Sequence, residues 1–341
     1  MHKRSERRRR WLRRAPPLRA GTFPADSASS GLATGVLVTG VVGGLGRRLV
    51  RLLHRECPVV GLDRRPFPDR PKDVEHYELD LRSSRIRDLF RSGRIGAIVH
   101  LPRVLEEPDG SGDEDAASHL TGFQKLLDHA QRFSVKKLVV LSSAAVYGAR
   151  PDNPQFLTEQ APLLGGGHSK HLAHWGSLDL LAQSFFWQYP GTETVIVRPA
   201  HLLGPIENAA SNYLRLTLVP TLLGFDPMIQ LLHVDDAASA LVRALKPGVR
   251  GIFNLAGPRP CSLSEALCVL GRRQVGVPRA LAQLGVANWF WRRAGDLSIP
   301  DLDFLRYVCM VDDRPARKVL EYRPAHDLRR TLEAVDEERW V

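Results

Sequence analysis

Three glycines and one aspartate carry the clearest chemistry in this sequence of 341 residues. Gly40, Gly43 and Gly46 stand three residues apart, and Asp63 follows Gly40 by 23 residues. Glycines at this spacing permit a tight turn, let the backbone approach a pyrophosphate and let a helix lie close to a sheet. The carboxylate of Asp63 can accept hydrogen bonds from both ribose hydroxyls of an adenosine. The four residues together predict a dinucleotide-binding site.

The elements that must hold these residues lie on either side of them. An apolar run at 36–39 predicts a buried strand, leucines at helical spacing follow, and a second apolar run at 59–62 ends on Asp63. This order of strand, glycine turn, helix and strand is the βαβ unit that binds dinucleotides. A pyrophosphate would meet the free backbone N–H groups at the helix start, around Gly44 and Leu45, where the helix dipole favours negative charge.

The rest of the chain continues this alternation of strands and helices. It predicts an α/β fold, with a Rossmann-type doubly wound parallel sheet and a smaller mixed C-terminal lobe. Further strands are predicted at 76–79, 97–100, 138–141 and 194–198, and one at 228–233 that returns to the main domain. We expect these parts: a basic disordered tail at 1–31, a dinucleotide-binding domain at 32–198 with a return of about 228–246, and a substrate-binding lobe over most of 199–341.

Charge is distributed unevenly along the chain. The net charge is +11, and residues 1–31 contain nine Lys and Arg against two acids, which leaves only +4 for the remaining 310 residues. The arginine run at 7–14 has the charge to bind nucleic acid or an anionic surface. It equally fits a disordered extension or translation from upstream of the true start. We expect a dispensable tail and no nucleic-acid partner, because no binding module accompanies the run.

Composition is that of an ordinary globular protein, with 43% hydrophobic and 25% charged residues. No window approaches 18 uninterrupted apolar residues, so neither a transmembrane helix nor a membrane partner is expected. The cysteines lack the spacing of a metal site, which predicts buried free thiols in a reducing compartment, the cytoplasm. They are Cys57, Cys261, Cys268 and Cys309.

In its motifs the sequence resembles the extended short-chain dehydrogenase/reductase superfamily, in particular its NAD-dependent nucleotide-sugar epimerases and dehydratases. The resemblance covers about residues 34–330. The segments that carry it are Thr39-Gly40-x-x-Gly43-x-x-Gly46, Asp63, Asp80-Leu81, Ser142-Ser143-x-x-Val146-Tyr147-Gly148, Arg198-Pro199-x-x-x-x-Gly204-Pro205, His233-Val234-Asp235-Asp236 and Leu320-Glu321-Tyr322-Arg323-Pro324.

The resemblance implies NAD as cofactor and a nucleotide sugar as small-molecule substrate. Asp63 favours NAD, since a carboxylate repels the 2′-phosphate of NADP, but Arg64 and Arg65 follow it and keep NADP as the less favoured cofactor. Asp80 and Leu81 follow the third strand, where an acid can hydrogen-bond the adenine amine. A homodimer is a further expectation.

The catalytic residues depart from the family's pattern. The resemblance gives Ser143 the role of holding the substrate oxygen, and capping of the strand end is the alternative role for this hydroxyl. A helix with Tyr-x-x-x-Lys should follow, yet no tyrosine lies four residues before any of the eight lysines. Alignment of the helix places His171 at the tyrosine position and Trp175 at the lysine position. A second register would use Lys170 as the lysine, with Gly166 in place of the tyrosine.

His171 admits two interpretations. An imidazole titrates near neutral pH without a neighbouring lysine, so His171 is a candidate catalytic proton shuttle beside Ser143. The interpretation we favour is an ordinary, partly buried histidine in a site that has lost its chemistry. Two functions remain open: an epimerase or dehydratase that acts by reversible hydride transfer, and a catalytically degenerate dinucleotide-binding protein with a structural or redox-sensing role. No metal site is expected at His168, His171 and His174, which lack a carboxylate.

The C-terminal lobe offers weaker signals. Asn208, Asn212 and Tyr213 are candidate substrate contacts, and ordinary surface polar residues are the alternative. Asp235 and Asp236 open a helix, where acids suit the N-terminus. An amphipathic helix at 280–293 contains Trp289, Phe290 and Trp291. We expect it in the lobe core, with a substrate, a partner subunit or a membrane surface as alternatives.

Overall fold

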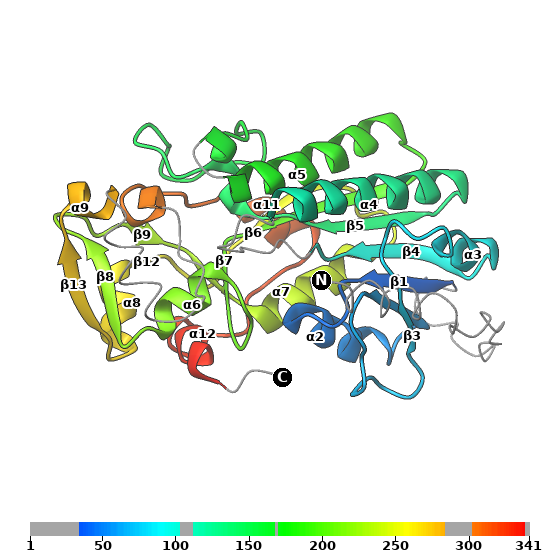
Figure 1. The fold of residues 1–341 in the computed structure, drawn as a ribbon, viewed down its shortest axis with the longest axis horizontal. Helices are drawn as coiled ribbons and strands as arrows, with labels where there is room; N and C mark the ends of the chain where they lie inside the picture. Colours follow the sequence, from blue (N-terminus) through cyan, green and yellow to red (C-terminus); the bar gives the residue numbers. More distant parts are fainter. Residues whose placement is uncertain (1–33, 103–111, 168–169, 284–301, 338–341) are drawn as a thin grey trace, which may run out of the picture.

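The computed structural model describes residues 34–102, 112–167, 170–283 and 302–337. Its centre is a parallel sheet of seven strands in the order β11-β6-β5-β4-β1-β2-β3 (Figure 1). The predicted doubly wound α/β fold is therefore confirmed. In chain order the strands of this sheet are β1 (Gly35–Thr39), β2 (Val59–Asp63), β3 (Glu75–Glu78), β4 (Ile95–His100), β5 (Lys137–Leu141), β6 (Glu193–Pro199) and β11 (Gly251–Leu255).

Helices cover both faces of this sheet (Figure 1). One face packs against α2 (Gly44–Leu53), α7 (Val234–Ala244) and α11 (Arg314–Val319). The other packs against α3 (Ile86–Arg91), α4 (Gly112–Arg132) and α5 (Lys170–Gln188). The central strands are apolar at nearly every position because both of their faces are buried. In β1, Val36 and Val38 face α2 and α7, whereas Leu37 faces α4 and α5.

The chain reverses its direction of winding at β1. The strand pairs with β2 on one side and with β4 on the other, and both pairings are parallel. The connections that leave β1 and β4 therefore diverge at their carboxyl ends. In open α/β sheets this divergence creates a crevice in which ligands bind. The predicted glycine turn follows β1 at that point.

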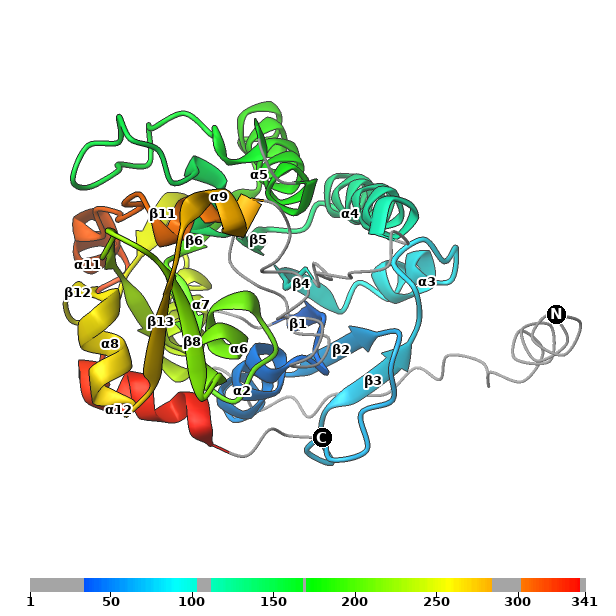
Figure 2. The same cartoon turned by 60° about the vertical axis from the view of Figure 1, so that its left-hand side comes forward.

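A smaller lobe continues from the carboxyl ends of β6 and β11, and it lies at the left of Figure 1 and toward the viewer in Figure 2. Its core joins apolar residues such as Tyr213, Leu263 and Leu332. Its helices are α6 (Ala209–Arg215), α8 (Leu263–Val269), α9 (Arg279–Gln283) and α12 (Leu328–Glu333). Its strands form three two-stranded sheets from β7 (His201–Leu203), β8 (Leu218–Leu222), β9 (Met228–Ile229), β10 (Leu231–His233), β12 (Cys261–Ser262) and β13 (Arg273–Val277).

The structure changes one expected element of this lobe. Residues 228–233 are not one strand: β9 pairs with β12, and β10 pairs with β7. Gln230 lies between the two short strands. Its side-chain amide nitrogen donates to the carbonyl of Val311 and its amide oxygen accepts from the backbone N–H of Val311, and these contacts interrupt the run. The strand that extends the main sheet is β11 instead.

Several expectations fall outside the described residues. They are the basic tail at 1–31, His168, and the part of the predicted helix 280–293 that contains Trp289, Phe290 and Trp291. Of that helix, α9 is described. Within the described ranges, no helix is both long enough and apolar enough to cross a membrane.

Candidate cofactor-binding site

The glycine turn after β1 has the geometry of a phosphate cradle. Gly40 has φ +71°, and a Cβ there would lie 2.1 Å from the carbonyl oxygen of Leu101. A Cβ on Gly46 would lie 2.5 Å from the carbonyl oxygen of Gly40, so only glycine lets α2 approach β1 this closely. A Cβ on Gly43 would have only an ordinary protein contact, at 3.4 Å. The open side of the turn is therefore at Gly43, where a ligand can reach the start of α2.

The first residues of α2 differ in what they present to that space. Leu45 is buried in the core below the sheet, so only its backbone remains for a ligand. A Cβ on Gly44 would lie 2.5 Å from Cγ2 of Ile206, which belongs to the smaller lobe. The part of the chain that contains the seven-stranded sheet and the smaller lobe are therefore in contact at the start of α2. The first backbone N–H groups of an α-helix have no partner within the helix, so the start of α2 can bind an anion.

Asp63 ends β2 directly beside the turn. Its Oδ2 accepts a hydrogen bond from the backbone N–H of Val42 at 3.1 Å, and its Oδ1 accepts one from the backbone N–H of Arg65, also at 3.1 Å. Each carboxylate oxygen has more than one acceptor position, so capacity remains for ribose hydroxyls. Arg64, the next residue, is exposed.

A pocket extends from Asp63 across the ends of the strands. The residues of its wall include Asp63, Asp80 and Leu81, which the sequence predicted to bind adenosine. The full wall is formed by Thr39, Gly40, Leu62, Asp63, Arg64, Arg65, Leu79, Asp80, Leu81, His100, Leu101, Pro102, Ser118, His119 and Leu178. Asp80 is engaged within the chain, since both of its carboxylate oxygens accept from Arg82 at 2.9 Å. Arg82 is also the chief reason why the pKa of Asp80 is lowered.

His100 and His119 lie in this wall, and the sequence assigned a role to neither of them. The Nδ1 of His100 lies 2.7 Å from Oγ1 of Thr39, and its ring stacks on Phe123 with centroids 4.4 Å apart. Burial, with a smaller effect of charge on His119, lowers the pKa of His100 to about 3. His100 is therefore neutral at physiological pH. The signal that could have found it is a polar residue at the carboxyl end of a central strand.

Ser143 lies after β5, where the resemblance placed it. Its Oγ accepts a hydrogen bond at 3.2 Å from the backbone N–H of Ala145 and caps the short 3-10 helix Ala144–Tyr147. The neighbouring Ser142 does not cap this helix, because it donates to Asp179 at 2.5 Å. The oxygen of Ser143 thus caps this short helix, whereas the alternative role expected from the sequence was a cap of the strand end. The hydroxyl can still donate its proton to another acceptor.

α5 presents His171, His174 and Trp175. His174 is 7% exposed, and burial together with charge on His119 and His171 lowers its pKa to about 4. Trp175, which the resemblance placed at the lysine position, packs against two apolar clusters. His171 is half-buried one turn before it. This helix therefore presents imidazoles and an indole at the positions where the resemblance led us to expect a phenol and an ammonium group.

Tyr147 does not supply the missing phenol. Its hydroxyl donates to Oδ1 of Asn254 at 2.8 Å and accepts from Nη1 of Arg198, also at 2.8 Å. Burial raises its pKa to about 12. Arg198 in turn forms a two-fold hydrogen-bonded ion pair with Asp179. These four residues form a buried network that supports the site, and sequence analysis identified only Arg198 and Tyr147 as motif residues, without their connection.

The lobe residues proposed as substrate contacts all have partners within the chain. The side chain of Asn208 caps α6 by accepting from Ser211 at 2.8 Å. Asn212 accepts from Arg215 at 2.9 Å, and the hydroxyl of Tyr213 donates to the carbonyl of Pro220 at 2.7 Å. These contacts give each residue a role in holding the lobe together.

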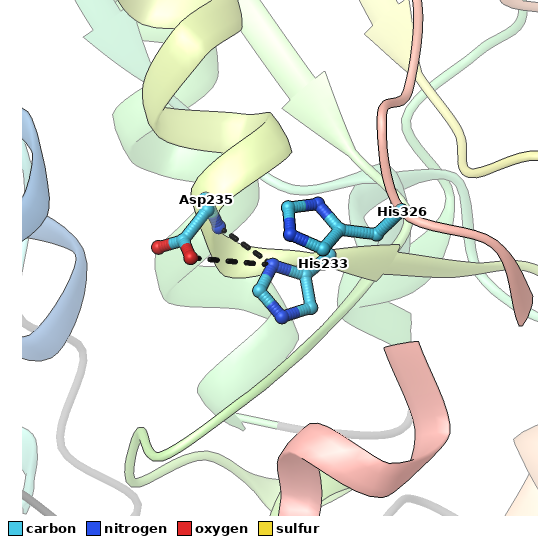
Figure 3. A group of neighbouring side chains, drawn as sticks. All are labelled: His233, Asp235 and His326. Atoms are coloured by element: carbon cyan, nitrogen blue, oxygen red, sulfur yellow. Dashed lines mark hydrogen bonds and ion pairs between the residues drawn. The ribbon is translucent and has the colours of Figure 1, made fainter. Parts of the chain in front are cut away.

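One group of described residues comes close enough to hold a metal ion: His233, Asp235 and His326 (Figure 3). The two rings are stacked, with centroids 3.7 Å apart and an interplanar angle of 12°. Imidazole lone pairs lie in the ring plane, so nearly parallel rings cannot direct them at one ion. The Nδ1 of His233 instead accepts from the N–H of Asp235 at 3.1 Å and caps α7. Asp236 binds His326, which fastens the C-terminal segment to this helix.

The sequence matches the NAD dependent epimerase/dehydratase family over residues 36–256. An uncharacterized protein of Mycobacterium tuberculosis is 30% identical over 320 residues, which cover 89% of this chain and 82% of that protein. The UDP-glucuronate 4-epimerase of Thermodesulfobacterium geofontis is 26% identical over 268 residues, covering 69% and 79% of the two chains. The chain therefore belongs to the NAD dependent epimerase/dehydratase family.

The fold has close counterparts among solved structures. The UDP-glucuronic acid 4-epimerase of Bacillus cereus, solved in complex with UDP-glucuronic acid and NAD, aligns with a TM-score of 0.69. The alignment covers 88% of this chain and 97% of the epimerase, at 18% identity. At this identity the likeness establishes the shared fold.

Proposed function

We propose that this member of the NAD dependent epimerase/dehydratase family binds NAD at the carboxyl edge of its sheet and acts there on a nucleotide sugar. The observation that carries the proposal is the cradle. Gly43 opens toward the start of α2, while Asp63 stands beside the same turn with acceptor capacity for a ribose. A pyrophosphate fits the first group and an adenosine ribose fits the second.

The residues that would hold NAD come from the glycine turn, the start of α2 and the pocket wall. The backbone around Gly43, Gly44 and Leu45 would bind the pyrophosphate, Asp63 the adenosine ribose, and Asp80 with Leu81 the adenine. NAD is favoured over NADP because Asp63 would repel a 2′-phosphate, although Arg64 and Arg65 are close enough in sequence to attract one. Bound NAD would supply the nicotinamide ring as a hydride acceptor for a sugar carbon.

The substrate is proposed from the relatives and from the residues beyond the strand ends. Proteins of similar sequence and fold are named for their action on UDP-glucuronate. In this chain the Ser143 hydroxyl can donate a hydrogen bond to a sugar oxygen while its own oxygen still accepts from Ala145. His171 would take the hydroxyl proton as the sugar is oxidised and return it on reduction.

The second candidate is a dinucleotide-binding protein without turnover. It is favoured by Trp175, which is packed into apolar clusters and carries no charge at the position where the family has its lysine. In this version, bound cofactor would stabilise a fold used for structure or redox sensing.

A binding measurement followed by a substrate panel separates these candidates. NAD should raise the melting temperature of the full chain, because a ligand that binds only the folded state stabilises it. A panel of UDP- and GDP-sugars is then incubated with the NAD-loaded protein and the products are identified. A changed sugar supports the enzyme, and NAD binding without any product supports the second candidate. Absence of any effect of NAD on stability would contradict both.

Two variants test the assigned roles once a substrate is found. Ser143→Ala and His171→Phe should each reduce turnover by at least about tenfold, a lower bound beneath the roughly 10²- to 10⁴-fold that a positioned acid–base group contributes. Ser177→Ala is the matched control, because Ser177 lies on α5 and donates only to the carbonyl of Ala173 at 2.9 Å. Unchanged turnover in either variant would remove that residue from the mechanism.

A further inference from the structure

Arg306 in the smaller lobe has a guanidinium group with no carboxylate partner among the described residues. It follows the 3-10 helix Leu302–Leu305 and is half-buried. Its guanidinium carbon lies 5.1 Å from the ring centroid of Phe225 and 4.5 Å from that of Tyr307. Within the described ranges its side chain takes part in no hydrogen bond or ion pair, and its Nε is buried without a partner. The two rings therefore hold the guanidinium while its donors stay unused by these residues.

Other half-buried arginines of the same lobe have acceptors for their guanidinium groups. Arg215 donates to the carbonyl oxygen of Gly204 at 2.7 Å, and Arg272 forms an ion pair with Asp336. A guanidinium has five N–H donors, and a buried donor without an acceptor costs free energy unless a ligand or a water supplies one. Arg306 therefore differs from these two arginines in keeping its donors for a ligand.

The chain after Arg306 leads to the segment that contains Ser143. The Sγ of Cys309 lies 3.6 Å from the carbonyl oxygen of Ala144, the residue after Ser143. A chain advances by at most about 3.6 Å per residue, so the backbone of Arg306 lies within about 11 Å of Cys309. In Figure 1 this part of the chain is drawn in orange between α9 and α11. Arg306 is therefore a near neighbour of the segment that presents the candidate catalytic hydroxyl.

The chain before Arg306 packs just beyond the carboxyl edge of the sheet. The ring of Phe304 meets that of His201 edge-on, with centroids 5.7 Å apart. His201 comes two residues after Pro199, the last residue of β6, and β6 runs parallel to β1 within the same sheet. Burial lowers the pKa of His201 to about 4, so this imidazole adds no charge at neutral pH. Arg306 thus brings a positive charge to the same edge of the sheet as the proposed cofactor site.

We propose that Arg306 binds an oxyanion of the substrate, a phosphate or a carboxylate, and so holds the sugar near Ser143. The identity of this substrate rests on the proposed function. A planar guanidinium binds either group through two parallel charge-assisted hydrogen bonds. Phe225 and Tyr307 would fix the plane of the guanidinium by cation–π contact and keep water from its faces. A nucleotide sugar offers phosphates to such a group, and a uronic acid offers a carboxylate.

The test is calorimetric titration of the full chain with UDP, UDP-glucose and UDP-glucuronate, with and without saturating NAD. Arg306→Gln should weaken binding of at least one of these ligands by at least about tenfold, because the charge-assisted pair of hydrogen bonds is lost. Weaker binding of all three assigns Arg306 to a phosphate, and weaker binding of UDP-glucuronate alone assigns it to the carboxylate. Arg306→Lys should give intermediate affinity, since lysine keeps the charge without the fork.

Arg250→Gln is the matched control. Arg250 also lies over an aromatic ring, 4.1 Å from the centroid of Phe186, and it donates to the carbonyl of that residue. It directly precedes β11, at the amino edge of the sheet and away from the proposed site. The control should bind all three ligands as the unmodified chain does.

The Nε–H group of Arg306 gives a second readout that needs no variant. Its NMR resonance in the unmodified chain can be assigned through nuclear Overhauser effects from the Tyr307 ring. The resonance should shift when the ligand that calorimetry detects is added. A resonance that stays unshifted at saturation would overturn the inference even where Arg306→Gln fails to fold.

The outcomes separate this inference from the proposed function. If NAD does not bind but UDP binds with an affinity that depends on Arg306, the proposed function fails and the oxyanion site stands. If NAD binds and Arg306→Gln binds all three ligands as tightly as the unmodified chain, the inference alone is overturned. It is also overturned if the folded, unmodified chain binds none of the three, or if Arg250→Gln weakens binding as much as Arg306→Gln.

Discussion

Arg198 and Asp179 form an ion pair that is almost completely buried, with exposures of 1% and 0%. Nη2 and Nε of the arginine donate to the two carboxylate oxygens at 2.7 and 2.8 Å. The pair ties β6 to α5, the helix that carries His171. Because Ser142 and Tyr147 complete the same network, the segment that presents Ser143 is fixed by it as well.

Removal of one partner from this pair should be costly. Asp179→Asn leaves the guanidinium of Arg198 buried without its counter-charge, and we expect the free energy of unfolding to fall by about 3–5 kcal/mol. Urea denaturation followed by circular dichroism measures it. Asp152→Asn breaks the exposed pair with Arg150 and should change the stability little. Equal effects of the two substitutions would contradict the structural role of the buried pair.

The fold was predictable from the sequence because its signals are local. A strand such as β1, apolar at nearly every position, must be covered on both faces, and the glycine spacing after it identifies the turn. The Arg198–Asp179 pair was not predictable, since its residues are 19 apart and nothing local links them. The same holds for Asn254, which meets Tyr147 across 107 residues.

The candidate site was predictable only in its cofactor half. Gly40, Gly43, Gly46 and Asp63 lie together through backbone geometry that the spacing of the glycines reveals. The histidines beside the pocket, His100, His119 and His174, come from three elements and become neighbours only when β4, α4 and α5 pack together. The interrupted run at 228–233 was missed for a related reason, because the amide contacts of Gln230 with Val311 are tertiary.

The glycines of the turn should separate stability from binding. A Cβ on Gly46 meets two backbone oxygens within 2.7 Å, so Gly46→Ala should lower the free energy of unfolding by about 1–3 kcal/mol, the usual cost of overpacking. Gly43→Ala meets no such obstacle and should cost less than about 1 kcal/mol, through the helix cap. Its methyl group would instead occupy the approach of the pyrophosphate.

Chemical denaturation and NAD titration of both variants check this difference. Gly43→Ala should stay folded with NAD affinity at least about tenfold weaker, since a lost pyrophosphate contact is a charge-assisted hydrogen bond. Full affinity in this variant would show that the cofactor does not approach the turn at Gly43. Full stability in Gly46→Ala would show that α2 can move away from β1.

Acid should destabilise the chain through its buried histidines. The pKa values of His100 and His174 are lowered from 6.5 to about 3 and about 4, mainly by burial. Below pH 6.5 the unfolded chain therefore binds protons that the folded chain does not, so stability falls as the pH decreases from about 6.5 toward 4. Each histidine contributes up to about 1.4 kcal/mol per pH unit in that window.

Urea denaturation at pH 7, 6 and 5 measures this slope. His174→Phe should reduce the slope of the free energy of unfolding against pH by the contribution of one titrating imidazole, because phenylalanine keeps a ring in place without a titrating group. For each protein, the free energies of unfolding at pH 6 and pH 5 are compared with the value of that same protein at pH 7. A free energy of unfolding that is constant between pH 7 and pH 5 would contradict the neutral, buried state of these imidazoles.

The choice between NAD and NADP should depend on Asp63. Asp63→Ser removes the carboxylate that would repel a 2′-phosphate and leaves Arg64 and Arg65 beside the ribose position, so the affinity ratio should shift toward NADP by at least about tenfold. Asp69→Asn is the matched control, since Asp69 pairs with Arg47 at 3.4 Å and lies outside the pocket wall. Titration of both nucleotides against each variant measures the ratio. If Asp63→Ser leaves the ratio at its original value, the ribose does not bind at Asp63, and the orientation proposed for the dinucleotide must be reversed or abandoned.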